Sequence, residues 1–259
     1  MKRILHPAPG TSSAMALFPV ILFLVAVLLP SFPANGNEEQ AFAALSTTLP
    51  KVQEEIVNKH NELRRAVSPT ASDMLKMRWS SEAAKKAQAW ADQCKLKHSD
   101  APYRKLNTSC GENLFMSSAP YSWSSAIQEW YDERENFKYN VGPLSANKPV
   151  GHYTQVAWFS SFQVGCGVSY CPSQPTFKYF MVCHYCPAGN NLARLYVPYK
   201  QGASCASCPD HCEDRLCTNA CEHEDDYSNC VSLKKSATCN HPLVKNGCKA
   251  SCFCENKIH

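Results

Sequence analysis

Two histidines and two glutamates are the side chains of this chain that could do chemistry together. His98, Glu112 and His152 lie far apart in the sequence, and an acidic residue of the segment 122–138 would complete the set. Imidazole and carboxylate groups both suit a divalent ion such as Zn²⁺. The same four side chains could instead only hydrogen-bond to one another across a polar cleft.

Helical geometry selects the fourth member. The segment 122–138 is predicted to be a helix with an apolar stripe made of Trp123, Ile127, Trp130 and Phe137. At 100° per residue, Glu133 lies about 75° from the centre of this stripe and Glu129 about 115° away, on the solvated side. We therefore predict Glu133, although a lone glutamate on a helix is more often a solvated surface residue.

Nucleophilic catalysis has less support. No Gly-x-Ser-x-Gly elbow occurs in the chain. Ser99 beside His98 and Thr154 near His152 are explained as ordinary polar residues. We therefore predict that the protein is not an enzyme, and a metal-dependent hydrolase is the least favoured hypothesis.

The N-terminal residues 1–34 are predicted to be a signal peptide. Residues 15–34 hold an apolar run that is short for a membrane span and that ends near Pro33 and Ala34. No later segment is apolar for long enough to cross a bilayer, so we expect a secreted, extracellular protein without a transmembrane anchor.

The charge balance excludes a polyanion partner. The chain has 26 basic and 22 acidic residues, and Lys2 and Arg3 precede the apolar run. Without these two, the balance is 24 to 22, so we predict no binding to nucleic acid.

Sixteen cysteines follow residue 93. An even number behind a signal peptide favours eight disulfides, since extracellular thiols are not kept reduced. Zinc bound at Cys183-x-x-Cys186 or Cys205-x-x-Cys208 is the weaker alternative. Six cysteines lie between 35 and 200 and ten between 205 and 254, so a domain with a real core precedes a tail that disulfides must stabilise.

The pattern of apolar residues predicts helices before strands. Helices are expected over 52–66, from the cap Ser80 to Cys94, and over 122–138. Short antiparallel strands are expected over 156–160, 162–170, 177–184 and 192–199. This order favours an α+β domain whose sheet is covered by the helices.

Two runs make the chain resemble the cysteine-rich secretory protein family, within the superfamily that includes plant pathogenesis-related proteins and insect antigen 5. Residues 151–158 (GHYTQVAW) match the first signature of this superfamily and 180–190 (FMVCHYCPAGN) match the second. Together with the ten-cysteine tail, the resemblance covers residues 45–254 and points to a mammalian member.

The resemblance implies an α-β-α sandwich, the CAP domain, over 35–200. It implies a hinge over 201–220 and a small module over 221–259 that is similar to sea-anemone potassium-channel toxins. The motifs place one site in the cleft of the sandwich, with ligands His98, Glu112, Glu133 and His152. In relatives this cleft can take Zn²⁺ or another divalent cation, which is not required for folding, and no general enzymatic activity follows.

The resemblance also implies a disulfide pattern, whereas the sequence alone leaves fifteen pairings open for the first six cysteines. The implied pairs are Cys94–Cys171, Cys110–Cys186, Cys166–Cys183, Cys205–Cys212, Cys208–Cys217, Cys221–Cys254, Cys230–Cys248 and Cys239–Cys252. Asn107 begins the one glycosylation sequon, in a polar loop.

The function expected from this resemblance is that of a non-enzymatic binding protein of reproductive or innate-immune fluids, which secretory granules could store. Its partners would be extracellular or cell-surface proteins, and sterol binding, reported for the superfamily, stays open. Some venom members block ion channels, so a channel regulator acting through 221–259 is the alternative. This module has five lysines, five acids and one tyrosine, Tyr227, so no cationic plug stands out, although Phe253 could be an exposed apolar contact.

Overall fold

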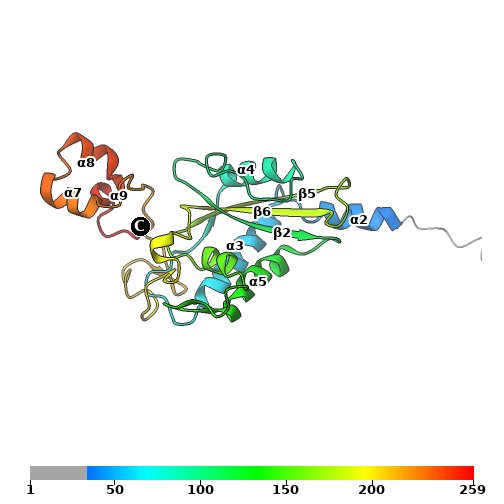
Figure 1. Ribbon diagram of the computed structural model, residues 1–259, viewed down its shortest axis with the longest axis horizontal. Helices are drawn as coiled ribbons and strands as arrows, with labels where there is room; N and C mark the ends of the chain where they lie inside the picture. The colour runs from blue at the N-terminus through cyan, green and yellow to red at the C-terminus, as the bar shows by residue number, and fades with distance from the viewer. Residues whose placement is uncertain (1–33) are drawn as a thin grey trace, which may run out of the picture. The chain divides into compact units, whose positions relative to one another are not determined.

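The computed structural model describes residues 34–259 (Figure 1). Apart from Ala34, the predicted signal peptide lies outside the described residues. The first described helix is α2 (Ala34–Ala43). Within the described range, no helix is both long enough and apolar enough to cross a membrane.

Two predicted helices are present. Helix α3 (Pro50–Arg65) begins two residues before the predicted start, with Pro50 in its first turn, and ends before Ser68-Pro69. Helix α4 (Ser81–Ala91) starts after Ser80, whose Oγ accepts the Ala83 N–H at 3.2 Å. It ends at Ala91, three residues before the predicted end.

The central sheet has four strands in the order β1-β5-β6-β2. Their bounds are β1 (Arg78–Trp79), β2 (Gly111–Ser117), β5 (Gln163–Tyr170) and β6 (Tyr179–Cys186). Strand β1 pairs parallel to β5, and the other two pairings are antiparallel. Every residue of β6 is buried, as expected for a strand that is covered on both faces.

Helices cover both faces of this sheet, which confirms the predicted α-β-α sandwich. Figure 1 shows α4 on one side of the strands, with α3 and α5 (Trp123–Asp132) on the other. Helix α4 approaches so closely that a Cβ on Gly165 would lie 2.2 Å from the Ala84 nitrogen. A Cβ on Gly167 would lie 2.4 Å from the Cα of Gln88. The two glycines of β5 therefore make room for the helix backbone.

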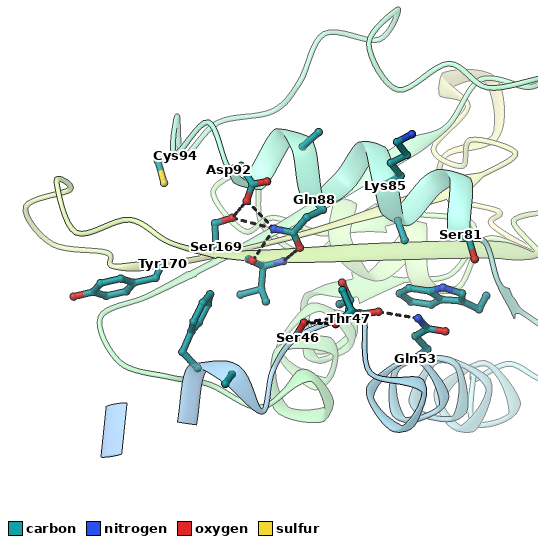
Figure 2. A pocket seen from close by; sticks show the side chains of 17 residues that line it. Ser46, Thr47, Gln53, Ser81, Lys85, Gln88, Asp92, Cys94, Ser169 and Tyr170 are labelled. Carbon is teal, nitrogen blue, oxygen red and sulfur yellow. Dashed lines mark hydrogen bonds between the residues drawn. The ribbon is translucent and has the colours of Figure 1, made fainter. Parts of the chain in front are cut away.

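A side chain covers the outer edge of β5 beyond its short pairing with β1. Gln88 accepts the Val168 N–H at 3.1 Å and donates to the Val168 carbonyl at 2.9 Å, as a neighbouring strand would. Figure 2 shows Gln88 held there beside Asp92 and Ser169. An exposed strand edge invites pairing with other chains, so this amide protects the sheet.

The remaining elements are short. They are η1 (Glu133–Asn136), β3 (Phe137–Lys138), β4 (Gly142–Pro143), α6 (Gly151–Val156), η2 (Leu192–Arg194), β7 (Cys212–Glu213), β8 (Leu216–Cys217), α7 (Cys230–Ala237), α8 (Pro242–Gly247) and α9 (Lys249–Phe253).

Three predictions of secondary structure were wrong. The helix predicted over 122–138 ends at Asp132 and continues as η1 and β3. The run 156–160, predicted as a strand, ends α6 and then turns, because its carbonyls accept hydrogen bonds from the Arg64 side chain rather than from a neighbouring strand. The run 192–199 holds only η2, whose start is capped by the Asn191 side chain. Strand β2 was not predicted, since the polar residues at its start hide the β pattern.

All sixteen cysteines form disulfides, and the eight pairs are those that the resemblance implies. The four hinge cysteines lie in two of these pairs. Cys205, Cys208, Leu216 and Cys217 are buried in the main core cluster together with Leu75. The Cys217 N–H donates to the Met74 carbonyl at 2.8 Å. The hinge residues 205–217 therefore pack as part of the sandwich's core.

The C-terminal module has a small core of its own. Cys230, Val244 and Cys248, from α7, α8 and the residue before α9, form one buried cluster. A second cluster joins Cys221, Ala250 and Cys254. Disulfides make up most of both clusters, as expected for a segment too short for a larger apolar core.

Candidate functional site

His98 and Glu112 form the first half of the candidate site. His98 Nδ1 lies 2.7 Å from Glu112 Oε1. The Glu112 side chain is 1% exposed and that of His98 is 60% exposed. A buried carboxylate therefore holds an imidazole that reaches into solvent.

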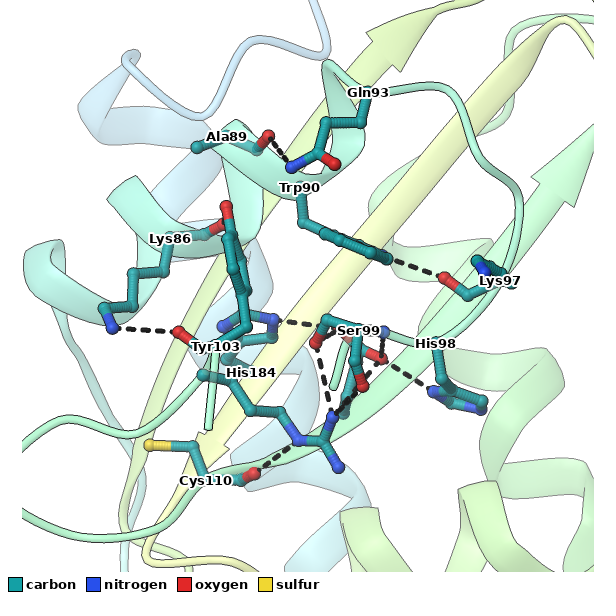
Figure 3. A network of polar contacts seen from close by, with 12 residues as sticks. Lys86, Ala89, Trp90, Gln93, Lys97, His98, Ser99, Tyr103, Cys110 and His184 are labelled. Atoms are coloured by element: carbon teal, nitrogen blue, oxygen red, sulfur yellow. Dashed lines mark hydrogen bonds and ion pairs between the residues drawn. The ribbon is translucent and has the colours of Figure 1, made fainter. Parts of the chain in front are cut away.

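Every strong acceptor position of Glu112 is already used. Its Oε1 also accepts the Ser99 N–H at 2.9 Å. Its Oε2 accepts from the Ser99 hydroxyl at 2.7 Å and from His184 Nε2 at 3.0 Å. Figure 3 shows His98 and His184 on opposite sides of Ser99. Register explains the His184 contact, since it lies directly opposite Glu112 in the β2–β6 ladder.

These hydrogen bonds set the charge of Glu112. Burial by itself raises the pKa of this carboxyl, but the hydrogen bonds from His184, His98 and Ser99 outweigh burial and lower the pKa to about 2. Glu112 is therefore ionised at neutral pH, with its charge spread over several donors.

Glu133 and His152 form the second half. His152 Nδ1 lies 2.6 Å from Glu133 Oε1, and Glu133 Oε2 accepts the backbone N–H groups of His152 at 2.8 Å and Tyr153 at 3.2 Å. These N–H groups belong to the first turn of α6, where the helix dipole also favours a carboxylate. Glu129, the rejected candidate, instead accepts a hydrogen bond from the exposed Tyr121 hydroxyl.

The four predicted residues thus form two His–Glu pairs. Asn113 links them, because it follows Glu112 in β2 and its Nδ2 donates to the His152 carbonyl at 3.2 Å. Within residues 34–259 the four do not form a cage in which three ligand atoms lie within 4.8 Å. The clusters that do, around Cys205 and around Cys230, consist mainly of disulfide sulfurs, which are not thiolate ligands.

The pairing decides which atoms could hold a metal. Both imidazoles use Nδ1 to contact a glutamate, and neither Nε2 has a hydrogen-bond partner in the described part of the chain. A carboxylate bonded to the far nitrogen of a ligand histidine fixes the ring and makes the near nitrogen more basic. Each ring therefore keeps its Nε2 available to bind a cation, with its glutamate orienting the ring.

The two runs that carry the resemblance hold each other in place. Thr154 donates to Asn190 Oδ1 at 2.7 Å, and Asn190 Nδ2 donates to the Gly151 carbonyl at 2.9 Å. Gln155 packs so closely on the glycine before Glu112 that a Cβ on Gly111 would lie 2.0 Å from Gln155 Oε1. The hydroxyls of Ser99 and Thr154 are both engaged, as expected for polar residues without a nucleophilic role.

Arg64 is the supporting residue that the sequence did not reveal. Its guanidinium is buried and donates to four backbone carbonyls, of Leu75, Val156, Trp158 and Phe159, at 2.7–3.0 Å. Three of these carbonyls belong to the end of α6 and the turn behind His152. No sequence signal distinguishes Arg64 from its half-buried neighbour Arg65.

Two further histidines and the sequon take clear positions. His184 is fully buried and bonded to Glu112, and its Nδ1 has no hydrogen-bond partner in the described part of the chain. His211 is exposed in the hinge, and Asn107 is exposed in a loop. A glycan on Asn107 stays a prediction.

Comparisons with known proteins agree with this fold. The family described as "CAP: Cysteine-rich secretory protein family" matches residues 57–185, and the family "Crisp" matches 205–259. Human cysteine-rich secretory protein 3 is 63% identical over 245 residues, which cover 95% of this chain and 100% of that protein. The cysteine-rich venom protein helothermine of Heloderma horridum horridum is 49% identical and covers 94% of this chain and 100% of its own length.

A solved structure described as NaASP2 with Zn²⁺ is also similar. It is 29% identical, has a TM-score of 0.55, and the match covers 66% of this chain and 96% of that one. None of these relatives is named for a catalytic activity. With two matching family descriptions and relatives aligned over their full length, this chain belongs to the cysteine-rich secretory protein family.

Proposed function

We propose that this chain is a secreted, non-enzymatic binding protein whose CAP domain binds a divalent cation, such as Zn²⁺, at His98 and His152. The observation that carries the proposal is that each ring is held at Nδ1 by a buried or half-buried glutamate and leaves Nε2 without a partner. The similar structure described with Zn²⁺ supports it. The absence of a free thiol among the described cysteines supports a role without a cysteine nucleophile.

Calorimetric titration with Zn²⁺ tests the metal site. We expect one Zn²⁺ to bind, and we expect His98→Ala or His152→Ala to abolish that binding. Glu112→Gln should weaken it about 10- to 100-fold, as loss of an orienting partner does at other metal sites.

His211→Ala is the matched control, since this histidine is exposed in the hinge, away from both pairs. It should bind as the unaltered protein does. Unchanged binding by the His98→Ala and His152→Ala double variant would refute the proposed site.

Regulation of an ion channel through residues 221–259 is the second candidate. Two of the five acids of this module have partners in the structure. Glu222 pairs with Arg78 at 2.6 Å, and Asp225 accepts from the Ser251 N–H at 2.9 Å. Lys235 and Lys245 stay exposed on α7 and α8, and the apolar side chain of Val231, four residues before Lys235 on α7, is exposed as well. The venom relative also favours this candidate.

Patch-clamp recording with the full chain tests it. A change in current at about micromolar protein, corresponding to roughly 8 kcal/mol of binding free energy, is expected to be lost when Lys235 and Lys245 are both changed to Gln. An effect that both substitutions leave intact would exclude this surface. The presence of the protein in reproductive or innate-immune fluids, its storage in granules and its binding to extracellular or cell-surface proteins stay predictions. Sterol binding stays open.

A further inference from the structure

A cavity lies where the CAP domain meets the C-terminal module. Its volume is about 390 Å³, at the lower end of the range of small-molecule sites, roughly 300–1,000 Å³. Residues of the two signature runs and the following loop form one wall, and residues of the module form the other. Neither member of either His–Glu pair lines it.

The CAP-domain wall presents a cation. The Arg194 guanidinium lies 4.6 Å from the centre of the Phe159 ring and 6.0 Å from that of Trp158. Its Nε donates to the Val197 carbonyl at a long 3.4 Å. Among residues 39–259, no carboxylate lies within ion-pair distance of Arg194. Its terminal nitrogens therefore keep donors available for a ligand.

The opposite wall presents a carboxylate. Glu224 is half-buried, and its Oε2 accepts the Ser109 N–H at 3.2 Å. No cation of the described chain forms an ion pair with it. Burial raises the pKa of this carboxyl, and the Ser109 N–H and the charge of Lys105 offset that rise only in part. Asp225 does not compete, because Ser251 already occupies both of its oxygens.

The surface between the two charges is largely apolar. Trp158 and Phe159 on one side and Ala250 and Ile258 on the other line the cavity and are buried. A simple ion would satisfy only one of the two charges, and a purely apolar ligand would leave both desolvated without a partner. A molecule that carries a carboxylate, an ammonium and an apolar group complements all three features.

From this arrangement we propose that the cavity binds a small zwitterion with an apolar side chain, of the size of a free amino acid. Its carboxylate pairs with Arg194, its ammonium with Glu224, and its side chain packs against Trp158 and Phe159. This inference does not depend on the metal site.

Calorimetry with L-phenylalanine, L-phenylalaninamide and 3-phenylpropionate tests the inference, since the second probe lacks the carboxylate and the third lacks the ammonium. We expect the zwitterion to bind at least about tenfold more tightly than either analogue, the difference that one charge-assisted hydrogen bond supports. Arg194→Gln should remove the preference for the zwitterion over L-phenylalaninamide. Glu224→Gln should remove the preference for the zwitterion over 3-phenylpropionate.

Two comparisons separate a lost ligand contact from a disturbed junction. Glutamine at 224 keeps an oxygen that can accept the Ser109 N–H, and Arg194 makes no hydrogen bond or ion pair to the module. Glu82→Gln, which changes an exposed glutamate of α4 that does not line the cavity, should leave all three affinities unchanged. Equal binding of the three probes, or no binding of the zwitterion up to about 10 mM, would overturn the inference.

Discussion

Replacing Arg64 with methionine is expected to lower the free energy of unfolding by about 3–5 kcal/mol, the usual loss when one partner of a buried charged network is removed. Methionine fills a similar volume but donates no hydrogen bond. The carbonyls of Leu75, Val156, Trp158 and Phe159 would remain buried without the donor they now share. Each buried carbonyl that loses its donor destabilises the folded protein, because its lost hydration is no longer offset by a hydrogen bond.

The charge of Arg64 persists despite its burial. Burial lowers the pKa of the guanidinium to about 9, so Arg64 is still protonated at neutral pH. Its hydrogen bonds are therefore charge-assisted and stronger than those between neutral groups. They hold the turn that follows α6, so Arg64→Met should also weaken Zn²⁺ binding at His152.

Arg65 is the matched control for this prediction. It is the next residue of the same helix, and its ion pair with Asp214, at 2.8 Å, joins a half-buried side chain to one that is 68% exposed. Arg65→Met should cost no more than about 1 kcal/mol. Denaturant unfolding of the oxidised proteins measures both values, and similar losses for the two variants would contradict the role given to Arg64.

His60 is expected to make the protein less stable in weak acid. This histidine is fully buried; its Nδ1 lies 2.8 Å from the Ile56 carbonyl and its Nε2 lies 2.9 Å from the Tyr185 hydroxyl. These contacts fit a neutral ring that donates from Nδ1 and accepts at Nε2. Burial lowers the pKa of His60 from 6.5 to about 4.

The direction of the effect follows from proton uptake. Below pH 6.5 the unfolded chain protonates His60 while the folded protein does not, so stability falls until the pH reaches about 4 and then levels off. Each pH unit in this window is worth about 1.4 kcal/mol, so His60 should account for a loss of about 2 kcal/mol between about pH 7 and pH 5.

Unfolding curves of His60→Gln measured across that range should show a weaker pH dependence, whatever the variant's absolute stability. His259→Gln, which changes an exposed histidine, should keep the original slope. If His60→Gln kept it too, the loss in weak acid would have another source. Glu112 contributes little to the slope above about pH 5, because its carboxyl takes up a proton in the unfolded chain only as the pH approaches 4.5.

Local patterns predicted the parts of the fold that depend on local interactions. The apolar spacing of α3 and the cap at Ser80 act within one or two helical turns, so the sequence displays them directly. Strands β5 and β6 were predicted because burial on both faces leaves long β-prone runs. The strand predicted over 156–160 was wrong because the aromatic residues of this run pack into the core from a helix end and a turn.

The site shows the same division. Glu133 was selected on the assumption of a continuous helix to residue 138, and the helix ends just before it. Its bond to His152 depends on where α6 begins, which is a long-range property. Arg64 and Arg65 are identical in type and adjacent in sequence, and only the carbonyls gathered around the first distinguish them. The resemblance of the motifs identified the four site residues, whereas only the structure shows that they form two separate pairs.

The burial of the hinge bears on where this protein can be cut. Leu216 and Cys217 fill the core beside Leu75, and backbone hydrogen bonds join the two segments in both directions. A recombinant fragment that stopped at Lys200 would expose that part of the core to water. A fragment continued through Thr218 would retain it, together with both hinge disulfides. For expression of the sandwich alone, or for a search for natural cleavage products, the C-terminal boundary belongs after the hinge.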